Sequence, residues 1–409
     1  MANADLSSHD AFLDGPPHET FARLRREEPV SRTAMAEGEP FWNLVRYDDV
    51  LAATQNFEAF SSARGIRMED QSLEEYEARK TFQETDPPVH TATRRKVARA
   101  FAKPVIARFE ADIRALCDDI LDEALASDEF DATEAIARQL PMRILGRIIG
   151  TPDADMDWLV TKGDALMSNA DPDFTDHVVD RMGTDAYRLM PFNSPAGAEL
   201  YDYARALRKD RLAAGTTDGV LDMILAPFED GSEISEEEFR NVFCLLVAAG
   251  NDTTRYSIAA GMHALAVGDT TLAAIRAADM DAGANEIIRW ASPTMHFRRT
   301  LTRDVELHGT TMQAGDKVVL WYVSANRDET AFEAPFELRL ERTPNRHLAF
   351  GQGGPHVCLG MWLARLEVRC LFEELARRVR AIELAGEPAH VRSNFVGGYK
   401  RLPVRVERA

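Results

Sequence analysis

The sequence has little of what several large classes of protein require. Its 409 residues include only four cysteines, Cys117, Cys244, Cys358 and Cys370, and no two of them have Cys-x-x-Cys spacing. This scarcity excludes a disulfide framework and argues against a cysteine-based zinc site. It fits a reducing compartment.

Positive charge and long apolar segments are scarce too. The chain carries 48 Lys and Arg against 67 Asp and Glu, a formal net charge of −19, so nucleic acid is not expected as a partner. No apolar run is long enough to span a bilayer, and residues 1–14 read as neither a signal peptide nor a membrane anchor. We expect a cytoplasmic protein. Flavin and nicotinamide motifs are also missing, so electrons for a redox reaction would arrive from another protein.

One short loop concentrates residues suited to holding a cofactor. Residues 350–360 read Phe-Gly-Gln-Gly-Gly-Pro-His-Val-Cys-Leu-Gly, and an amphipathic helix is predicted directly after them, over 361–378. Glycines allow a backbone to approach a ligand closely. Cys358 would lie at the helix N-terminus, where free N–H groups and the helix dipole lower the pKa of a thiol. The thiolate would be a soft ligand for a metal centre, haem iron being one candidate, and a buried structural cysteine is the alternative.

A long helix with a polar interruption is the second feature. Ser235-Glu236-Glu237-Glu238 is a capping box, and the helix it opens is predicted to run to about Val267, roughly 48 Å. Its apolar centre is interrupted by Gly-Asn-Asp-Thr-Thr at 250–254. An unpaired carboxylate in a core helix costs several kcal/mol, so this cluster indicates a site rather than an exposed stripe. We expect a locally opened turn where Asp252 and Thr253 hold water and pass protons.

The remaining chain predicts a mainly α protein with a small β component. A cationic helix over 89–102 places His90 and Arg94 on one face, as an anion clamp or as part of a solvated basic surface. Strands are predicted over 41–47 and 297–323, with a terminal hairpin over 380–409. Residues 61–84 read as a long loop, and 156–190 as two weak helical stretches of a mobile lid. Because the β segments come from distant parts of the chain, we expect one interleaved domain over 1–409, with 1–15 as a flexible terminus.

Five motifs together resemble those of the cytochrome P450 family in order and spacing. One is the cysteine loop, which has one residue more than the commonest family pattern. The others are Ala-Gly-Asn-Asp-Thr-Thr at 249–254, Glu286-x-x-Arg289, Arg342 ahead of Asn345 and His347, and Asp86-Pro-Pro-Val-His90 with Arg94. The likeness extends from about Pro16 to Val404. It implies the P450 fold, a single domain with a long central helix over a haem.

The resemblance also implies residue roles. Cys358 corresponds to the thiolate ligand of haem b, and Asp252 and Thr253 to the acid–alcohol pair that delivers protons to bound dioxygen. The cofactor-binding residues implied are His90, Arg94, Arg299 and His356, at the haem propionates, together with Phe350 and Gly351. The structural ion-pair triad implied is Glu286, Arg289 and Arg342. The expected walls of the substrate pocket are Ala249, Gly250, Met295, Phe395 and Val396.

The implied activity is an oxygen-dependent monooxygenase that hydroxylates an unactivated C–H bond. The cysteine loop is similar to that of a bacterial branch that oxidises sterols and methyl-branched lipids, so the implied substrate is a hydrophobic molecule such as a steroid or terpenoid. Electrons would come from ferredoxin and ferredoxin reductase, and the enzyme would be a monomer. Four basic residues are expected to dock the acidic ferredoxin: Arg95, Arg99, Arg365 and Arg369.

Two other functions stay open. One is a haem-thiolate enzyme that uses peroxide or rearranges its substrate, although the intact pair Asp252-Thr253 argues against it. The other is a non-catalytic haem ligand sensor, which no appended signalling domain supports.

Overall fold

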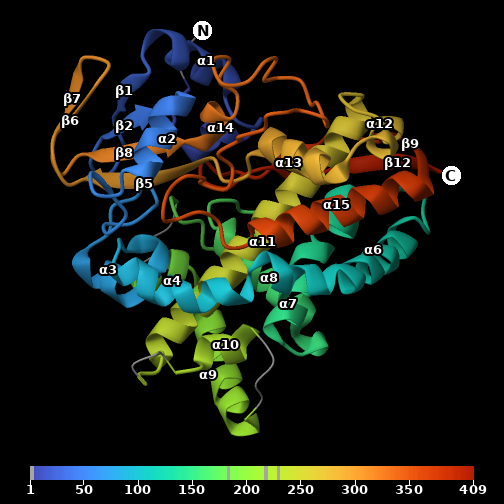
Figure 1. The fold of residues 1–409 in the computed structure, drawn as a ribbon, viewed down its shortest axis with the longest axis horizontal. Coiled ribbons are helices and arrows are strands. Elements are labelled where there is room, and N and C mark those ends of the chain that lie inside the picture. The colour runs from blue at the N-terminus through green and yellow to red at the C-terminus, as the bar shows by residue number, and fades with distance from the viewer. Residues whose placement is uncertain (1–3, 182–184, 216–219, 228–230) are drawn as a thin grey trace.

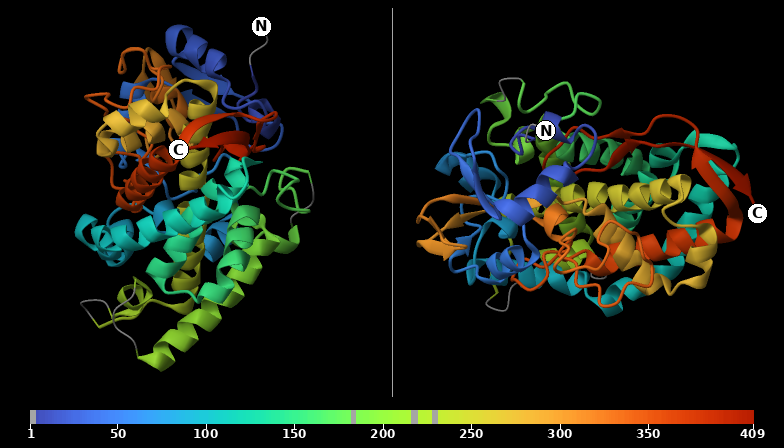
Figure 2. Two further views of the ribbon diagram at one scale, coloured as in Figure 1. Left: turned by 90° about the vertical axis from the view of Figure 1, so that its right-hand side faces the viewer. Right: turned by 90° about the horizontal axis from the view of Figure 1, so that it is seen from above.

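The computed structural model describes residues 4–181, 185–215, 220–227 and 231–409 (Figures 1 and 2). Its longer helices are α1 (His18–Glu27), α2 (Tyr47–Gln55), α3 (Leu73–Arg79), α4 (Val89–Ala100), α6 (Glu110–Ala124), α7 (Gln139–Ile149), α8 (Met156–Met167), α9 (Pro195–Ala214), α11 (Glu236–Val267), α13 (Met280–Ala291) and α15 (Met361–Arg378). The shorter ones are α5 (Lys103–Ile106), α10 (Val220–Leu225), α12 (Leu272–Ala277) and α14 (Tyr322–Ala325). The strands are β1 (Val30–Thr33), β2 (Phe41–Leu44), β3 (Phe60–Ser61), β4 (Glu129–Asp131), β5 (His296–Leu301), β6 (Val305–Leu307), β7 (Thr310–Met312), β8 (Lys317–Trp321), β9 (Val379–Leu384), β10 (Ala389–His390), β11 (Tyr399–Arg401) and β12 (Pro403–Arg408).

The β segments come from distant parts of the chain, as the sequence predicts. The five-stranded sheet has the order β1-β2-β8-β5-β3, in which β2 runs parallel to β8 with Phe41 opposite Lys317. The predicted terminal hairpin is confirmed in β9 and β12, which pair antiparallel and take β4 as a third strand. Figure 1 shows the five-stranded sheet at one end of the molecule and the helices filling the rest. The mainly helical class expected from the sequence is confirmed.

The interior helix is α11, which packs against α7, α8, α9 and α13 (Figure 2). The predicted capping box is present: the hydroxyl oxygen of Ser235 accepts a hydrogen bond from the N–H of Glu238, and the carboxylate of Glu238 accepts one from the N–H of Ser235. The prediction of a locally opened turn is wrong, because α11 continues without a break through 250–254. The hydroxyl of Thr253 donates to the carbonyl of Ala249 (2.8 Å) within the helix, and Asp252 finds side-chain partners on α8. The polar residues therefore need no unwinding.

One stripe of α11 keeps accessible surface although the helix is otherwise interior. Leu245, Ala249 and Thr253 are half-buried or exposed, whereas Val247, Ala248 and Asn251 are buried. The three stand at i, i+4 and i+8, one above the other on the same face. This face therefore borders a space inside the protein.

The N-terminal segment differs from its expected flexibility. Leu6 and Phe12 are buried, Phe12 stacks 6.0 Å from Trp321, and the Nδ1 of His9 accepts from the N–H of Asn394 (3.2 Å). Apolar side chains in this acidic stretch give it a core to bury, so residues 4–15 are part of the fold. Residues 1–3 lie outside the described range.

The two segments predicted to be loops or a lid are partly regular. Residues 61–84 contain α3, which opens with a second capping box at Ser72, and a 3-10 helix over Phe82–Glu84. In the segment 156–190, α8 is the first predicted helix. The second is present only as a short 3-10 turn, Asp185–Tyr187, within the described residues. No helix in the described part of the chain combines the length and apolarity needed to cross a bilayer.

Buried histidines make folding stability depend on pH. His296 donates from Nδ1 to the carbonyl of Asn394 (3.0 Å), and burial lowers its pKa to about 3. In the unfolded chain a histidine takes up a proton near pH 6.5, whereas His296 in the folded protein takes one up only at a much lower pH. The free energy of unfolding should therefore fall by about 2 kcal/mol for this residue between pH 7 and pH 5. Urea unfolding of His296→Gln across this range should show a shallower fall, and an unchanged slope would contradict this assignment.

Candidate functional site

The glycine loop folds tightly against α2. Gly351 has a φ of +62°, and a Cβ on Gly354 would lie 2.1 Å from the carbonyl oxygen of Thr54, so no other residue fits there. The N–H of Cys358 donates to the carbonyl of Phe350 (2.9 Å) and closes the loop. α15 begins three residues later, as predicted, and Cys358 is thereby presented at its N-terminus.

Cys358 differs from the other cysteines. The other three are buried, whereas Cys358 keeps accessible surface. Burial nevertheless raises the pKa of its thiol, and the N–H groups of Gly360 and Met361 and the guanidinium of Arg94 only partly oppose this. Accessible surface within buried surroundings means that the sulfur faces an interior space. The expectation that the helix N-terminus alone lowers this pKa is wrong, because desolvation outweighs it. A metal ion would supply the missing positive charge.

Four basic side chains gather next to the cysteine loop. The rings of His90 and His356 lie 4.3 Å apart, and Arg94 donates to the carbonyl of Val357. Arg299 on β5 is buried and acts on the pKa of His356. The structure thus brings together the four residues predicted from three separate segments. His356 is further held by the hydroxyl of Ser62 (3.3 Å), a contact that the sequence did not predict.

No counter-charge pairs directly with this cluster in the described part of the chain, and Asp86 acts on His90 and Arg299 only from further away. Among the described residues, no carboxylate forms a hydrogen bond or ion pair with any of the four, and both ring nitrogens of His90 and the Nδ1 of His356 lack a partner. Burial lowers the pKa of His90 to about 4 and of His356 to about 2, and lowers the pKa values of Arg94 and Arg299 as well. Buried bases without an anion are suited to binding one. Haem carries two propionates and an iron that needs an axial ligand, so these residues and Cys358 fit it.

Asp252 lies in a buried polar network at the middle of α11. Its carboxylate accepts from the hydroxyl of Ser168 (3.2 Å) and pairs with Arg255 (3.1 Å), whose other Nη pairs with Asp164 of α8 (2.6 Å). Burial raises the pKa of Asp252, and Arg255 opposes that rise. A carboxyl group in this setting can hold a proton closer to neutral pH than an exposed one.

The network reaches toward the surface. Arg138, which is partly exposed, donates from Nε to Asp164 (2.6 Å) and pairs with the exposed Glu134. The sequence reading missed Asp164, Ser168 and Arg255. The available signal for Asp164 was a carboxylate on the apolar side of the helix 156–167, next to Leu159, Val160 and Met167.

The predicted ion-pair triad is present. Glu286 is fully buried and receives Arg289 on both oxygens (2.8 Å each) and the Nε of Arg342 (3.0 Å). The N–H of Arg339 and the side chain of Asn345 donate to the same carboxylate. This arrangement joins α13 to the segment ahead of the cysteine loop, so it orders the fold around the loop.

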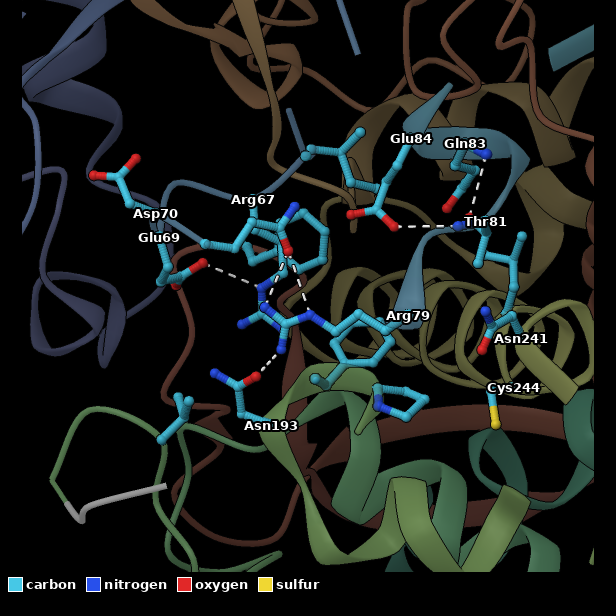
Figure 3. Close-up of a pocket in the computed structure, with 18 residues that line it drawn as sticks. Arg67, Glu69, Asp70, Arg79, Thr81, Gln83, Glu84, Asn193, Asn241 and Cys244 are labelled. Atoms are coloured by element: carbon cyan, nitrogen blue, oxygen red, sulfur yellow. Dashed lines mark hydrogen bonds and ion pairs between the residues drawn. The ribbon is translucent and has the colours of Figure 1, made fainter. Parts of the chain in front are cut away.

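The expected pocket walls separate into two groups. Phe395 lines a cavity of about 100 Å³ together with Leu245, and Ala249 follows one turn later on α11 (Figure 3). Gly250 instead faces Leu145 of α7, which a Cβ would meet at 2.7 Å. Met295 packs with Phe12 and Trp321 in the core next to the N-terminal segment, and it lines a different cavity, so it is not brought to this one. Val396 is buried beside Phe395.

The expected docking residues are not equally available. Arg369 is paired with Glu110 (2.7 Å) and Asp281 (3.5 Å), and Arg365 donates to Asn285 (2.8 Å) while lying over the ring of Trp362. Arg95 and Arg99 of α4 are exposed. The positive charge that this face offers to a partner protein is therefore smaller than predicted, because Arg365 and Arg369 already have partners within the chain.

A cysteine at the start of α15, flanked by buried bases without an anion and served by a polar network on an interior helix, defines a protein of the thiolate-ligated cofactor class. Comparison with known proteins is more specific. The family model for cytochrome P450 matches residues 280–387. The chain is 38% identical to the methyl-branched lipid omega-hydroxylase of Mycobacterium tuberculosis, over 99% of this chain and 95% of that protein. It is 30% identical to the steroid C26-monooxygenase of Mycolicibacterium smegmatis, over 99% and 95%. The structure of Mycobacterium marinum cytochrome P450 CYP268A2 in complex with pseudoionone matches with a TM-score of 0.89 at 34% identity, covering 99% of this chain and 98% of that one.

The chain belongs to the cytochrome P450 family, and it is a cytochrome P450 monooxygenase. The family implies a haem cofactor.

Proposed function

We propose that this enzyme, folded as one domain, binds haem b through Cys358 and hydroxylates a hydrophobic small molecule of the steroid or terpenoid kind, with electrons from a ferredoxin. The observation that carries the cofactor assignment is the cluster of His90, Arg94, Arg299 and His356, which has no carboxylate in contact among the described residues. Two propionates would supply that charge. The haem, when bound, supplies the activation of O2 that lets one oxygen atom enter a C–H bond while the other leaves as water.

The chain's own residues would do three things. Cys358 would hold the cofactor from the cysteine loop, and the basic cluster would fix its orientation. The face of α11 with Leu245, Ala249 and Thr253 would position the substrate and limit water in the interior space. Asp252 would hold a proton in its network and release it, and Thr253 would carry a hydroxyl at the same level of the helix.

The substrate class rests on the relatives. The curated relatives named above are a methyl-branched lipid hydroxylase and a steroid monooxygenase, and the solved relative holds pseudoionone. The apolar residues Phe395, Leu245 and Phe192 of the cavity favour a compound of similar hydrophobicity. The test is a spin-state titration of the haem-loaded protein with steroids, terpenoids, fatty acids and small aromatics, followed by turnover of the best binder. Product formed with NADH, ferredoxin reductase and ferredoxin supports the proposal. Product formed only with peroxide would favour the peroxide-driven alternative, and binding without oxygen consumption the sensor.

Asp252→Asn should slow turnover by roughly a hundredfold, because the amide cannot release a proton into the network. The solvent isotope effect on kcat should rise, while substrate affinity stays nearly unchanged. Asp171→Asn is the matched control, since Asp171 is equally buried but pairs with Lys400 (2.8 Å) outside this network. If both variants lost kcat equally, Asp252 would have no special part in proton delivery.

Arg95→Glu should lower kcat/KM for ferredoxin about tenfold at low salt, because Arg95 is exposed next to Arg94 on α4. The loss should shrink as salt screens the interaction. Arg401→Glu, a reversal at an exposed position on β11, serves as control. Equal losses in the two variants, or a loss that also appears in peroxide-driven turnover, would contradict docking at α4.

A further inference from the structure

Two guanidinium groups lie in the mainly apolar cavity shown in Figure 3. The cavity is bounded by α11 at Leu245, by segment 191–193 and by segment 65–84, and Phe192 and Phe395 form much of its apolar wall. Arg67 and Arg79 both line it, and the positive charge of Arg67 adds to burial in lowering the pKa of Arg79. Charged groups in such a place point to a polar end on the ligand.

Arg79, the last residue of α3, binds only uncharged acceptors. Its Nε and Nη2 both donate to the Oε1 of Gln71 (3.3 and 3.0 Å), and its Nη1 donates to the carbonyl of Arg188 (3.0 Å) and to Asn193. No carboxylate of the described residues forms an ion pair with it. Burial lowers its pKa although Glu75 and Glu84 raise it from further away. A half-buried cation whose hydrogen bonds go to neutral groups is a strong donor that lacks its best partner.

The three carboxylates that line the cavity are each engaged by other groups. Asp70 pairs with Arg298 (3.1 Å) and Lys317 (2.9 Å), which do not line it. Glu69 pairs with Arg67 (3.3 Å), whose guanidinium also lies 5.1 Å from the ring centres of Phe192 and Phe395. Glu84 accepts from the N–H of Thr81 (3.4 Å), and burial raises its pKa, which weakens its negative charge. Among the described residues, these carboxylates therefore have partners or a weakened charge, and none of them forms an ion pair with Arg79.

We propose that Arg79 is a specificity-determining residue that binds the carboxylate of an amphipathic substrate; this rests on the proposed hydroxylation of a hydrophobic small molecule. The amide oxygen of Gln71 occupies the position between Nε and Nη2 that a carboxylate takes when it binds a guanidinium with both oxygens. A substrate carboxylate would replace that neutral acceptor. Its apolar part would run along Phe395 and Leu245 toward Ala249 and Thr253.

The geometry sets where on the substrate oxidation would occur. Leu245, which lines the cavity with Arg79, and Thr253 are two turns apart on α11, roughly 12 Å along the helix axis. The C–H bond presented near Thr253 would thus lie far from the carboxylate, toward the other end of an extended chain.

The test compares two ligands with one carbon skeleton, citronellic acid and citronellol, by calorimetric titration of the haem-loaded protein without reductant. The wild type should bind the acid more tightly. Arg79→Gln should weaken the acid about tenfold to a hundredfold and leave the alcohol nearly unchanged, and Arg79→Lys should recover part of the loss. Arg188→Gln is the control, because it breaks the ion pair of Arg188 with Glu74 (2.7 Å) between the same two segments but keeps the charge of Arg79.

Three results would overturn the proposal: equal weakening of acid and alcohol in Arg79→Gln, no weakening of either, or a wild type that prefers the alcohol. Equal weakening would mean that Arg79 only ties α3 to segment 188–193. Because binding is measured without turnover, selective binding of the acid with no ferredoxin-driven hydroxylation of it would count against the proposed hydroxylation and leave the binding role of Arg79 standing. Oxidation of neutral ligands with no effect of Arg79→Gln would do the reverse. Haem content and melting temperature of each variant confirm that it is folded.

Discussion

Cys358→Ser should abolish monooxygenase turnover and remove the red-shifted absorption of the reduced carbonyl adduct that thiolate ligation produces. A serine hydroxyl is a far weaker ligand than a thiolate and donates less electron density to iron. The loop itself should survive the change, because its closing hydrogen bond runs from the backbone N–H of residue 358 to the carbonyl of Phe350. The expected variant is thus folded and inactive. Haem content, the carbonyl spectrum and product formation measure the three parts of this result.

Cys370→Ala is the matched control. Cys370 lies within α15, twelve residues after Cys358, and is fully buried. The control should lose some stability from the missing sulfur and keep both the spectrum and the activity. A Cys358→Ser variant that retained the red-shifted spectrum would show that another cysteine ligates the iron, and the assignment of Cys358 as the ligand would have to be abandoned.

The sequence was informative wherever a local pattern has a local physical cause. The glycines of the cysteine loop, the capping box at Ser235 and the pair Glu286–Arg289 each act within a few residues, so their structure follows from spacing. The order of these motifs along the chain then identified the family, and with it the fold. The mainly helical architecture and the long interior helix are confirmed on that basis.

Contacts between segments that are distant in the sequence could not be predicted from local patterns. Asp164 meets Asn251 and Arg255, and Ser168 meets Asp252, only because α8 packs against α11. Nothing in the spacing of residues 80 or more apart encodes that packing. The same holds for Met295, whose apolar side chain could serve either cavity and packs by Trp321. Burial likewise depends on segments from the whole chain. It raises the pKa of Cys358, and the helix N-terminus, which is the only local feature visible in the sequence, does not predict that rise.

The number of charges around Asp252 and around Glu286 decides how the protein should respond when each carboxylate is substituted. Both are buried carboxylates whose charge is met by arginine. Around Asp252 the charges are balanced, with Arg138 and Arg255 against Asp164 and Asp252, so removing one charge there leaves part of the network paired. Around Glu286 a single carboxylate serves Arg289 and Arg342, so nothing replaces it.

Glu286→Gln should therefore be the most destabilising single substitution at this site, by about 3–5 kcal/mol. The amide keeps the shape of the side chain but leaves Arg289 and Arg342 buried without a counter-charge. Its oxygen can still accept a hydrogen bond from a guanidinium group, but its NH2 group is a donor that faces other donors. That loss is a large part of the roughly 5–15 kcal/mol that stabilises a typical fold. We expect low yield, poor haem retention and an earlier urea unfolding midpoint, followed by far-UV circular dichroism and by haem absorbance.

Glu333→Gln isolates the effect of burial from that of losing an ion pair. Glu333 pairs with Arg339 at 3.4 Å near the same segment, but its side chain is 88% exposed, so the substitution should change the free energy of unfolding by less than about 1 kcal/mol. If the two variants unfolded at the same urea concentration, the triad would contribute no more than a surface pair. In that case the segment ahead of the cysteine loop would have to be held by its other contacts, such as the hydrogen bond from the N–H of Leu348 to the side chain of Asn326 (2.6 Å).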